Sequence, residues 1–257
     1  MPDRRSRAVL CALALIGCVR EETQHKATGN VLFRQGSVEA AIAEYRAAVK
    51  ADPDDAEAWV LLGNAVFERG DLAEAHDAFT RARRILPEAH GAIGGLAKIA
   101  IRRGNHAEAE KHLDELLSLR PTDAQAHRDL GALRLSRGDL AGADAELERA
   151  LLLVPEDPAT LYLRGRVQAR RGLHEQALAT CDEVARLAPQ RPWSEYCRAV
   201  AYAQKGALDR ALASLESALG RGLSDLDSVR SDAALTPLRA DARFAALLER
   251  SRTPRPR

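Results

Sequence analysis

The sequence predicts an all-α protein, a solenoid of helix–turn–helix repeats, and the main observation behind this prediction is a fixed residue spacing. Glycines, alanines and prolines each recur every 34 residues along the 257-residue chain. The recurring residues are Gly36, Gly70, Gly104, Gly138, Gly172 and Gly206, then Ala41, Ala75, Ala109, Ala143, Ala177 and Ala211, and Pro53, Pro87, Pro121, Pro155 and Pro189. One fixed period is typical of stacked repeats that share a continuous core. Apolar residues follow helical spacing, and no strand-like alternation appears.

Each repeat is expected to contain two helices whose ends are marked by particular residues. The recurring glycine should end the first helix in the left-handed conformation. In the first four repeats, the next side chain can accept hydrogen bonds from the free N–H groups of the second helix. These residues are Ser37, Asp71, Asn105 and Asp139. Proline then ends the second helix, and the recurring alanines fit where two helices approach closely.

The second repeat carries nearly all the marks of one known family. Its marking residues are Trp59, Leu62, Gly63, Gly70, Ala75, Phe79, Ala82 and Pro87. This pattern resembles the tetratricopeptide-repeat (TPR) family, which implies a right-handed solenoid whose concave groove is lined by the first helix of each repeat. The resemblance covers residues 22–225 as six repeats, which are 22–55, 56–89, 90–123, 124–157, 158–191 and 192–225.

The 34-residue spacing stops after residue 225. Residues 226–250 resemble the closing segment of many bacterial TPR proteins, and we expect short helices there to cover the open end of the stack. The covering residues are expected to be Leu235, Leu238, Phe244 and Leu248. Residues 251–257 are expected to form a disordered, solvated basic tail.

Residues 1–17 have the three zones of a secretory signal peptide. Three arginines precede an uncharged apolar run at residues 8–16, which is too short to span a bilayer. The ending L-I-G-C resembles a lipobox, which implies cleavage before Cys18 and its acylation. Residues 18–21 would then form the lipidated N-terminus and a short tether. An ordinary signal peptide and an uncleaved apolar helix are the alternatives.

The predicted location is the bacterial cell envelope, with the outer membrane facing the periplasm favoured over the inner membrane. Val19 stands where an aspartate would imply retention at the inner membrane. The formal net charge is +1, and it falls to near −1 without residues 1–17. This charge does not suggest general nucleic-acid binding.

Cys181 and Cys197 are the two cysteines that remain after Cys11 is removed with the signal and Cys18 is acylated. They fall on packing neighbours, the second helix of repeat five and the first helix of repeat six. In an oxidising periplasm they could form a disulfide. The favoured interpretation is two small buried apolar side chains.

No catalytic or metal-binding motif is found in the sequence. His106 and His112 are six residues apart and do not share a helical face at ligand spacing. The signal, the repeats and the closing segment account for the whole chain. We therefore predict no enzymatic activity, no metal and no cofactor.

The expected protein-binding residues are those that the resemblance places in the groove. They are Lys98, Arg102, Arg128, Tyr162, Arg166, Arg170, Trp193 and Tyr196. The middle repeats contribute five cations and one carboxylate, which favours an acidic peptide or a C-terminal carboxylate as ligand. The alternative of equal weight is a solvated helix face. The co-chaperone carboxylate clamp is not expected, because the residues at three of its five positions are Leu61, Gly91 and Gly95.

Repeat six departs from the family pattern, because its apolar stripe competes with the expected core register. The stripe consists of Trp193, Tyr196, Cys197 and Val200. Either the aromatic residues face the groove as an anchor, or the helix rotates to bury them. Burial is favoured, because exposing both rings costs apolar area.

These observations predict a lipid-anchored TPR scaffold or adaptor that binds other proteins and catalyses nothing. The alternative is a pilotin-type assembly lipoprotein for a type IV pilus or a secretion pore, since known pilotins of one class are six-repeat lipoproteins of this size. An enzyme is disfavoured, because no nucleophile–base pair or metal set is visible.

Overall fold

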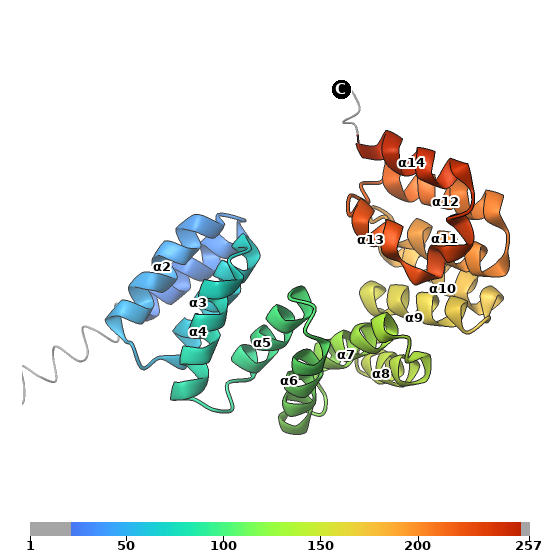
Figure 1. Cartoon of the computed structure of the whole chain (residues 1–257). Coiled ribbons are helices and arrows are strands. Elements are labelled where there is room, and N and C mark those ends of the chain that lie inside the picture. The colour runs from blue at the N-terminus through green and yellow to red at the C-terminus, as the bar shows by residue number, and fades with distance from the viewer. Residues whose placement is uncertain (1–21, 253–257) are drawn as a thin grey trace, which may run out of the picture. The chain divides into compact units, whose positions relative to one another are not determined.

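The computed structural model describes residues 22–252, and these residues form helices and no strand (Figure 1). The chain divides into two compact units, Met1–Pro121 and Thr122–Arg257. The predicted signal peptide, the lipidation site Cys18 and residues 253–257 of the predicted tail lie outside the described residues. The prediction of a disordered tail from residue 251 is wrong at its start, because Ser251 and Arg252 belong to helix α14 (Ala242–Arg252). Among residues 22–252, no helix combines the length and apolar character needed to cross a membrane.

The first unit contains three helix pairs. It begins with a helix over residues 22–34. The helices that follow are α2 (Val38–Ala51), α3 (Ala56–Arg69), α4 (Leu72–Ile85), α5 (His90–Arg102) and α6 (His106–Leu119). Consecutive helices pack against each other, and α3 also contacts α5.

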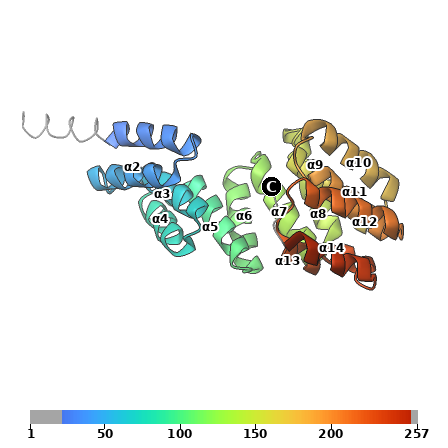
Figure 2. The same ribbon diagram turned by 90° about the horizontal axis from the view of Figure 1, so that it is seen from above.

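The second unit contains three further helix pairs and the C-terminal segment. Its elements are α7 (Ala124–Arg137), α8 (Leu140–Leu153), α9 (Pro158–Arg170), α10 (His174–Leu187), α11 (Trp193–Lys205), α12 (Leu208–Gly220), α13 (Leu226–Ser231), the 3-10 helix η1 (Ala233–Leu238) and α14 (Ala242–Arg252). Figure 2 shows α9 to α12 lying side by side. The predicted all-α fold of stacked helix pairs is therefore confirmed within each unit.

The helix ends follow the residues that the spacing marks. All six recurring glycines have positive φ, and Gly70 at φ 96° ends α3. Asp71 accepts hydrogen bonds from the backbone N–H groups of residues 73 and 74, and Asn105 and Asp139 cap α6 and α8 in the same way. Ser37 differs, because its side chain makes no capping hydrogen bond to α2.

Small residues allow the helices of each unit to approach closely. The six recurring alanines are fully buried. Phe79 of α4 fills the space beside Gly63 of α3 and Gly95 of α5. A Cβ added at Gly95 would lie 2.3 Å from the Phe79 ring, which is too close for any real contact. Gly63 and Gly95 are thus required by packing, whereas the six recurring glycines are required by turn geometry.

The C-terminal segment covers the end of the second unit as expected. Leu235, Leu238, Phe244 and Leu248 are all buried, in a core with residues of α11 and α12. Helix α13 is attached more lightly, because Val229 is its one fully buried residue. The segment therefore has a firmly packed part, η1 and α14, and a short preceding helix beside the first helices of the repeats.

Candidate protein-binding site

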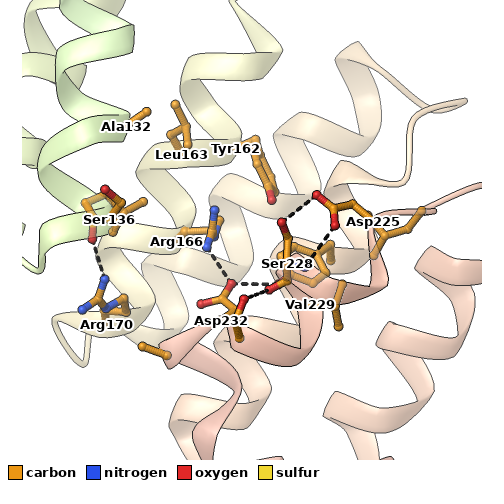
Figure 3. A pocket seen from close by; sticks show the side chains of 15 residues that line it. Ala132, Ser136, Tyr162, Leu163, Arg166, Arg170, Asp225, Ser228, Val229 and Asp232 are labelled. Carbon is orange, nitrogen blue, oxygen red and sulfur yellow. Dashed lines mark hydrogen bonds and ion pairs between the residues drawn. The ribbon is translucent and has the colours of Figure 1, made fainter. Parts of the chain in front are cut away.

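A pocket of about 520 Å³ lies in the second unit between the first helices of its repeats and the segment around α13 (Figure 3). Helices α7, α9 and α11 contribute Ala132, Leu135, Ser136, Tyr162, Leu163, Arg166, Arg170 and Tyr196. The C-terminal segment contributes Leu223, Asp225, Ser228, Val229, Ser231, Asp232 and Ala233. Three of the predicted groove residues from α9, together with Tyr196 from α11, therefore line one pocket.

Arg166 binds Asp232 at the centre of this pocket. Its Nη2 donates to Asp232 Oδ2 at 2.6 Å, and the Tyr196 hydroxyl donates to the same oxygen at 2.7 Å. The other oxygen of Asp232 accepts the backbone N–H of Ala234 at 2.9 Å, which caps η1. The Asp232 side chain is 10% exposed and that of Arg166 is 21% exposed. The carboxylate is thus held by three donors in a mostly enclosed place.

The surroundings of Arg166 and Tyr196 favour the protonated form of each side chain. Burial alone would lower the pKa of Arg166, but Tyr162 and Asp232 outweigh it, so the pKa is raised. Burial and the nearby Asp232 charge raise the pKa of Tyr196. At neutral pH Arg166 is therefore a cation and Tyr196 a hydroxyl donor.

Aromatic rings hold Arg166 in place from α9 and α11. Its guanidinium lies 5.6 Å from the Tyr162 ring centre and 5.7 Å from that of Tyr196. Tyr162 stacks on Trp193 with ring centres 6.1 Å apart. Tyr196, Cys197 and Val200 are buried and Trp193 is half-buried, so α11 adopts the favoured alternative of burial.

The other arginines predicted for the groove also have partners within the chain. Arg128 pairs with Asp157 at 3.0 Å, and Arg170 donates to the Leu135 carbonyl at 2.7 Å. In the first unit, the Arg102 guanidinium lies 5.0 Å from the centre of the Phe67 ring.

These contacts change the interpretation of the predicted basic groove. The structure places Lys98 and Arg102 on α5 of the first unit and the other six predicted residues in the second. These arginines are not open positive charges, because each of them contacts a partner within the chain. The sequence spacing gives the positions of the arginines but not these partners. Their role in binding a partner stays a prediction.

Asp232 is the site residue that sequence reasoning missed. It lies 66 residues from Arg166 and outside the repeat register. The one signal in the sequence was that an aspartate at position 232 is suited to cap the next helix. That signal predicts a helix start and gives no indication of which cation the carboxylate meets.

Cys181 of α10 and Cys197 of α11 are joined by a disulfide, with Cα atoms 5.7 Å apart. Both residues are fully buried. The structure therefore contains the disulfide rather than the favoured alternative of two unpaired thiols. No group of His, Cys, Asp and Glu residues in the described part of the chain is arranged to hold a metal ion.

The helix pairs and their sequence marks are those of tetratricopeptide repeats. The family of the cytochrome c-type biogenesis protein H TPR domain matches residues 39–161, and a general tetratricopeptide repeat matches residues 158–183. The matched part of the chain, residues 39–183, thus consists of tetratricopeptide repeats, and residues 39–161 are similar to the TPR domain of that biogenesis protein. No curated protein matches the sequence.

Three solved structures with similar folds are distant from this chain in sequence. A chain of the APC/C hetero-tetramer Cut9–Hcn1 has a TM-score of 0.74 at 18% identity, over 96% of this chain and 46% of that one. This chain therefore spans about half of that longer protein. YrrB, described as a TPR protein with an unusual peptide-binding site, has a TM-score of 0.54 at 20% identity, over 72% and 96%. PilF of Pseudomonas aeruginosa has a TM-score of 0.65 at 17% identity, over 87% and 99%.

Proposed function

We propose that this protein is a lipid-anchored adaptor of the bacterial cell envelope that binds other proteins and catalyses no reaction. The observation that carries the binding role is the pocket on α7, α9 and α11, with Arg166 at its centre. TPR folds present such surfaces to peptides, and the polar groups of this pocket are suited to fix the position of a bound segment.

The proposed envelope location has two supports. The first is the L-I-G-C ending with Cys18 after a short apolar run. The second is the disulfide between Cys181 and Cys197, a bond that persists in oxidising compartments. Val19 after the cysteine favours the outer membrane facing the periplasm.

The first experiment tests the anchor. The wild-type chain expressed in a diderm bacterium should incorporate a fatty-acid analogue and fractionate with membranes. Cys18→Ser should remain an unprocessed precursor without label, because the acylated sulfur is absent. Acylation of the Cys18→Ser variant would refute the lipoprotein proposal.

The second experiment tests the adaptor role. Crosslinking in intact cells, followed by purification from membranes, should recover defined partner proteins with the wild-type chain. An Arg166→Gln variant that retains its thermal stability should recover less of those partners. If no protein is enriched over a control with an unrelated lipoprotein, the adaptor proposal is wrong.

A pilotin-type role for a type IV pilus or secretion pore is the second candidate. Its support is architectural: six repeats behind a lipobox, with a fold that covers 99% of the PilF chain.

The match of residues 39–161 to the biogenesis protein H domain also makes cytochrome c-type assembly a candidate pathway. The identity of the crosslinked partner distinguishes these roles.

A further inference from the structure

We propose that the pocket of the second unit is a docking site for a partner segment that presents an acidic side chain, and that Asp232 occupies this site when the partner is absent. This inference rests on the proposed adaptor function and names the chemistry of the partner. Three features of the molecule support it: the distribution of charge in the pocket, the hydrogen bonding of Arg166 and the light attachment of α13.

Charges of opposite sign line the two sides of the pocket. The repeat helices contribute the cations Arg166 and Arg170 and no carboxylate. The C-terminal segment contributes the carboxylates Asp225 and Asp232 and no cation. The segment therefore faces the basic surface of the repeat helices with acidic side chains. The ion pair between Arg166 and Asp232 shows that this surface accepts a carboxylate (Figure 3).

Asp232 leaves part of the binding capacity of Arg166 unused. Only Nη2 of the guanidinium reaches the carboxylate, while the buried Nε has no hydrogen-bond partner. A guanidinium can bind a carboxylate through two parallel N–H groups, and this arrangement is stronger than a single bond. A partner carboxylate that used both Nε and Nη2 would therefore satisfy a donor that the intramolecular contact does not.

The segment that carries Asp232 has a firmly packed end and a lightly packed end. Leu235 and Leu238 of η1 are fully buried, so they keep the cap in place. Before them, α13 has six residues and follows Gly222, which has a φ of 95°. Release of Asp232 from Arg166 gives up its cap on η1, while buried Leu235 and Leu238 keep η1 packed. Short elements with few buried side chains open at low free-energy cost.

Occupation by Asp232 should lower the apparent affinity for a partner, because the partner binds only the fraction of molecules in which the site is open. Asp232→Asn keeps the side-chain shape but removes the charge that competes for Arg166. Asp227→Asn is the matched control, since it removes a carboxylate from the same short helix, away from the pocket.

The test measures binding of a fluorescein-labelled peptide of five Asp-Ser units by anisotropy, with a five-unit Asn-Ser peptide as the neutral control. Asp232→Asn should bind the acidic peptide about tenfold more tightly than the wild type or Asp227→Asn, and the double variant Arg166→Gln with Asp232→Asn should lose this gain. Equal affinities for Asp232→Asn and Asp227→Asn, or tight binding without Arg166, would overturn the proposal.

A second measurement uses the wild-type chain and does not depend on how well the variants fold. Saturating acidic peptide should increase hydrogen–deuterium exchange at residues 226–232 and leave exchange at residues 235–238 unchanged. Unchanged exchange at residues 226–232 in the saturated complex would contradict displacement of Asp232. Either failure leaves intact the adaptor proposal, which is judged by partner recovery from membranes.

Discussion

Cations at one position of the repeat are held by a carboxylate at another position of the same repeat. Lys26 and Arg128, each the fifth residue of its repeat, pair with Asp55 and Asp157, each the last residue of its repeat, at 2.7 and 3.0 Å. Both aspartates also cap the following helix. Each aspartate thus starts a helix and neutralises a cation, and in the case of Asp157 this cation is Arg128, which is predicted to face the groove.

The charge of Asp157 is expected to contribute stability at neutral pH. Burial alone would raise the pKa of this carboxyl, but hydrogen bonds from Thr160 and Arg128 outweigh burial and hold the pKa below its usual value. A lowered pKa in the folded state means that the contribution is present above about pH 4 and is lost as the pH falls further. Asp157→Asn keeps a capping side chain and should cost about 1 kcal/mol at pH 7.

Urea unfolding of the wild type and Asp157→Asn at pH 7 and at pH 3 checks this prediction. The difference in unfolding free energy should shrink at the lower pH, because the wild-type carboxylate is then partly protonated. Glu183→Gln, at an exposed position, is the control and should change little at either pH. A difference that stays constant between the two pH values would contradict an electrostatic origin.

At the scale of helices, Phe79 joins α3, α4 and α5 through two glycines. Its ring lies where a Cβ at Gly63 or Gly95 would stand, 2.6 and 2.3 Å from the nearest ring carbons. The ring is 1% exposed, so it has little room to move. The third helix of this contact belongs to the next repeat, so the glycines set the spacing both within and between repeats.

Gly95→Ala should therefore destabilise the protein by about 1–3 kcal/mol through overpacking. Gly220→Ala is the matched control, because Gly220 ends α12 with no atom within 4 Å of a new Cβ, and the exchange should be neutral or slightly stabilising. Thermal melting compares the two variants. Adding Phe79→Leu to Gly95→Ala should recover part of the loss if the ring is the obstacle. Equal melting temperatures for the two glycine variants would show that the space beside Phe79 is not limiting.

The helices can be predicted from the sequence because their ends depend on local chemistry. Gly70 takes positive φ and Asp71 caps the next helix, whatever the rest of the chain does. The candidate site depends on distant contacts instead. Arg166 could be placed on a groove position by the 34-residue register, but its partner Asp232 lies beyond the last repeat, where no register applies. The repeat spacing therefore predicts the helices and the positions of the cations. It does not predict which of these cations pair with a carboxylate of the same chain.

At the scale of the whole molecule, the disulfide connects protein stability with cellular location. Cys181 and Cys197 are 16 residues apart and link α10 of repeat five to α11 of repeat six. Helix α11 also supplies Tyr196 to the pocket. A bond that closes a loop of this length stabilises the folded state by about 3 kcal/mol, mainly by restricting the unfolded chain.

Reduction should thus lower the melting temperature by several degrees, and the double variant Cys181→Ser with Cys197→Ser should melt at the lowered temperature with or without reductant.

Cells quenched in acid and treated with a thiol-alkylating reagent then report the state of the bond in vivo. The full-length chain should resist alkylation at both cysteines, whereas a version without residues 1–18 should be alkylated, because the cytoplasm keeps thiols reduced. Full alkylation of both cysteines in the full-length chain would argue against the bond and remove one support for the envelope location. Resistance in both versions would show that the buried pair is protected regardless of compartment, and the location would then depend on Cys18 acylation alone.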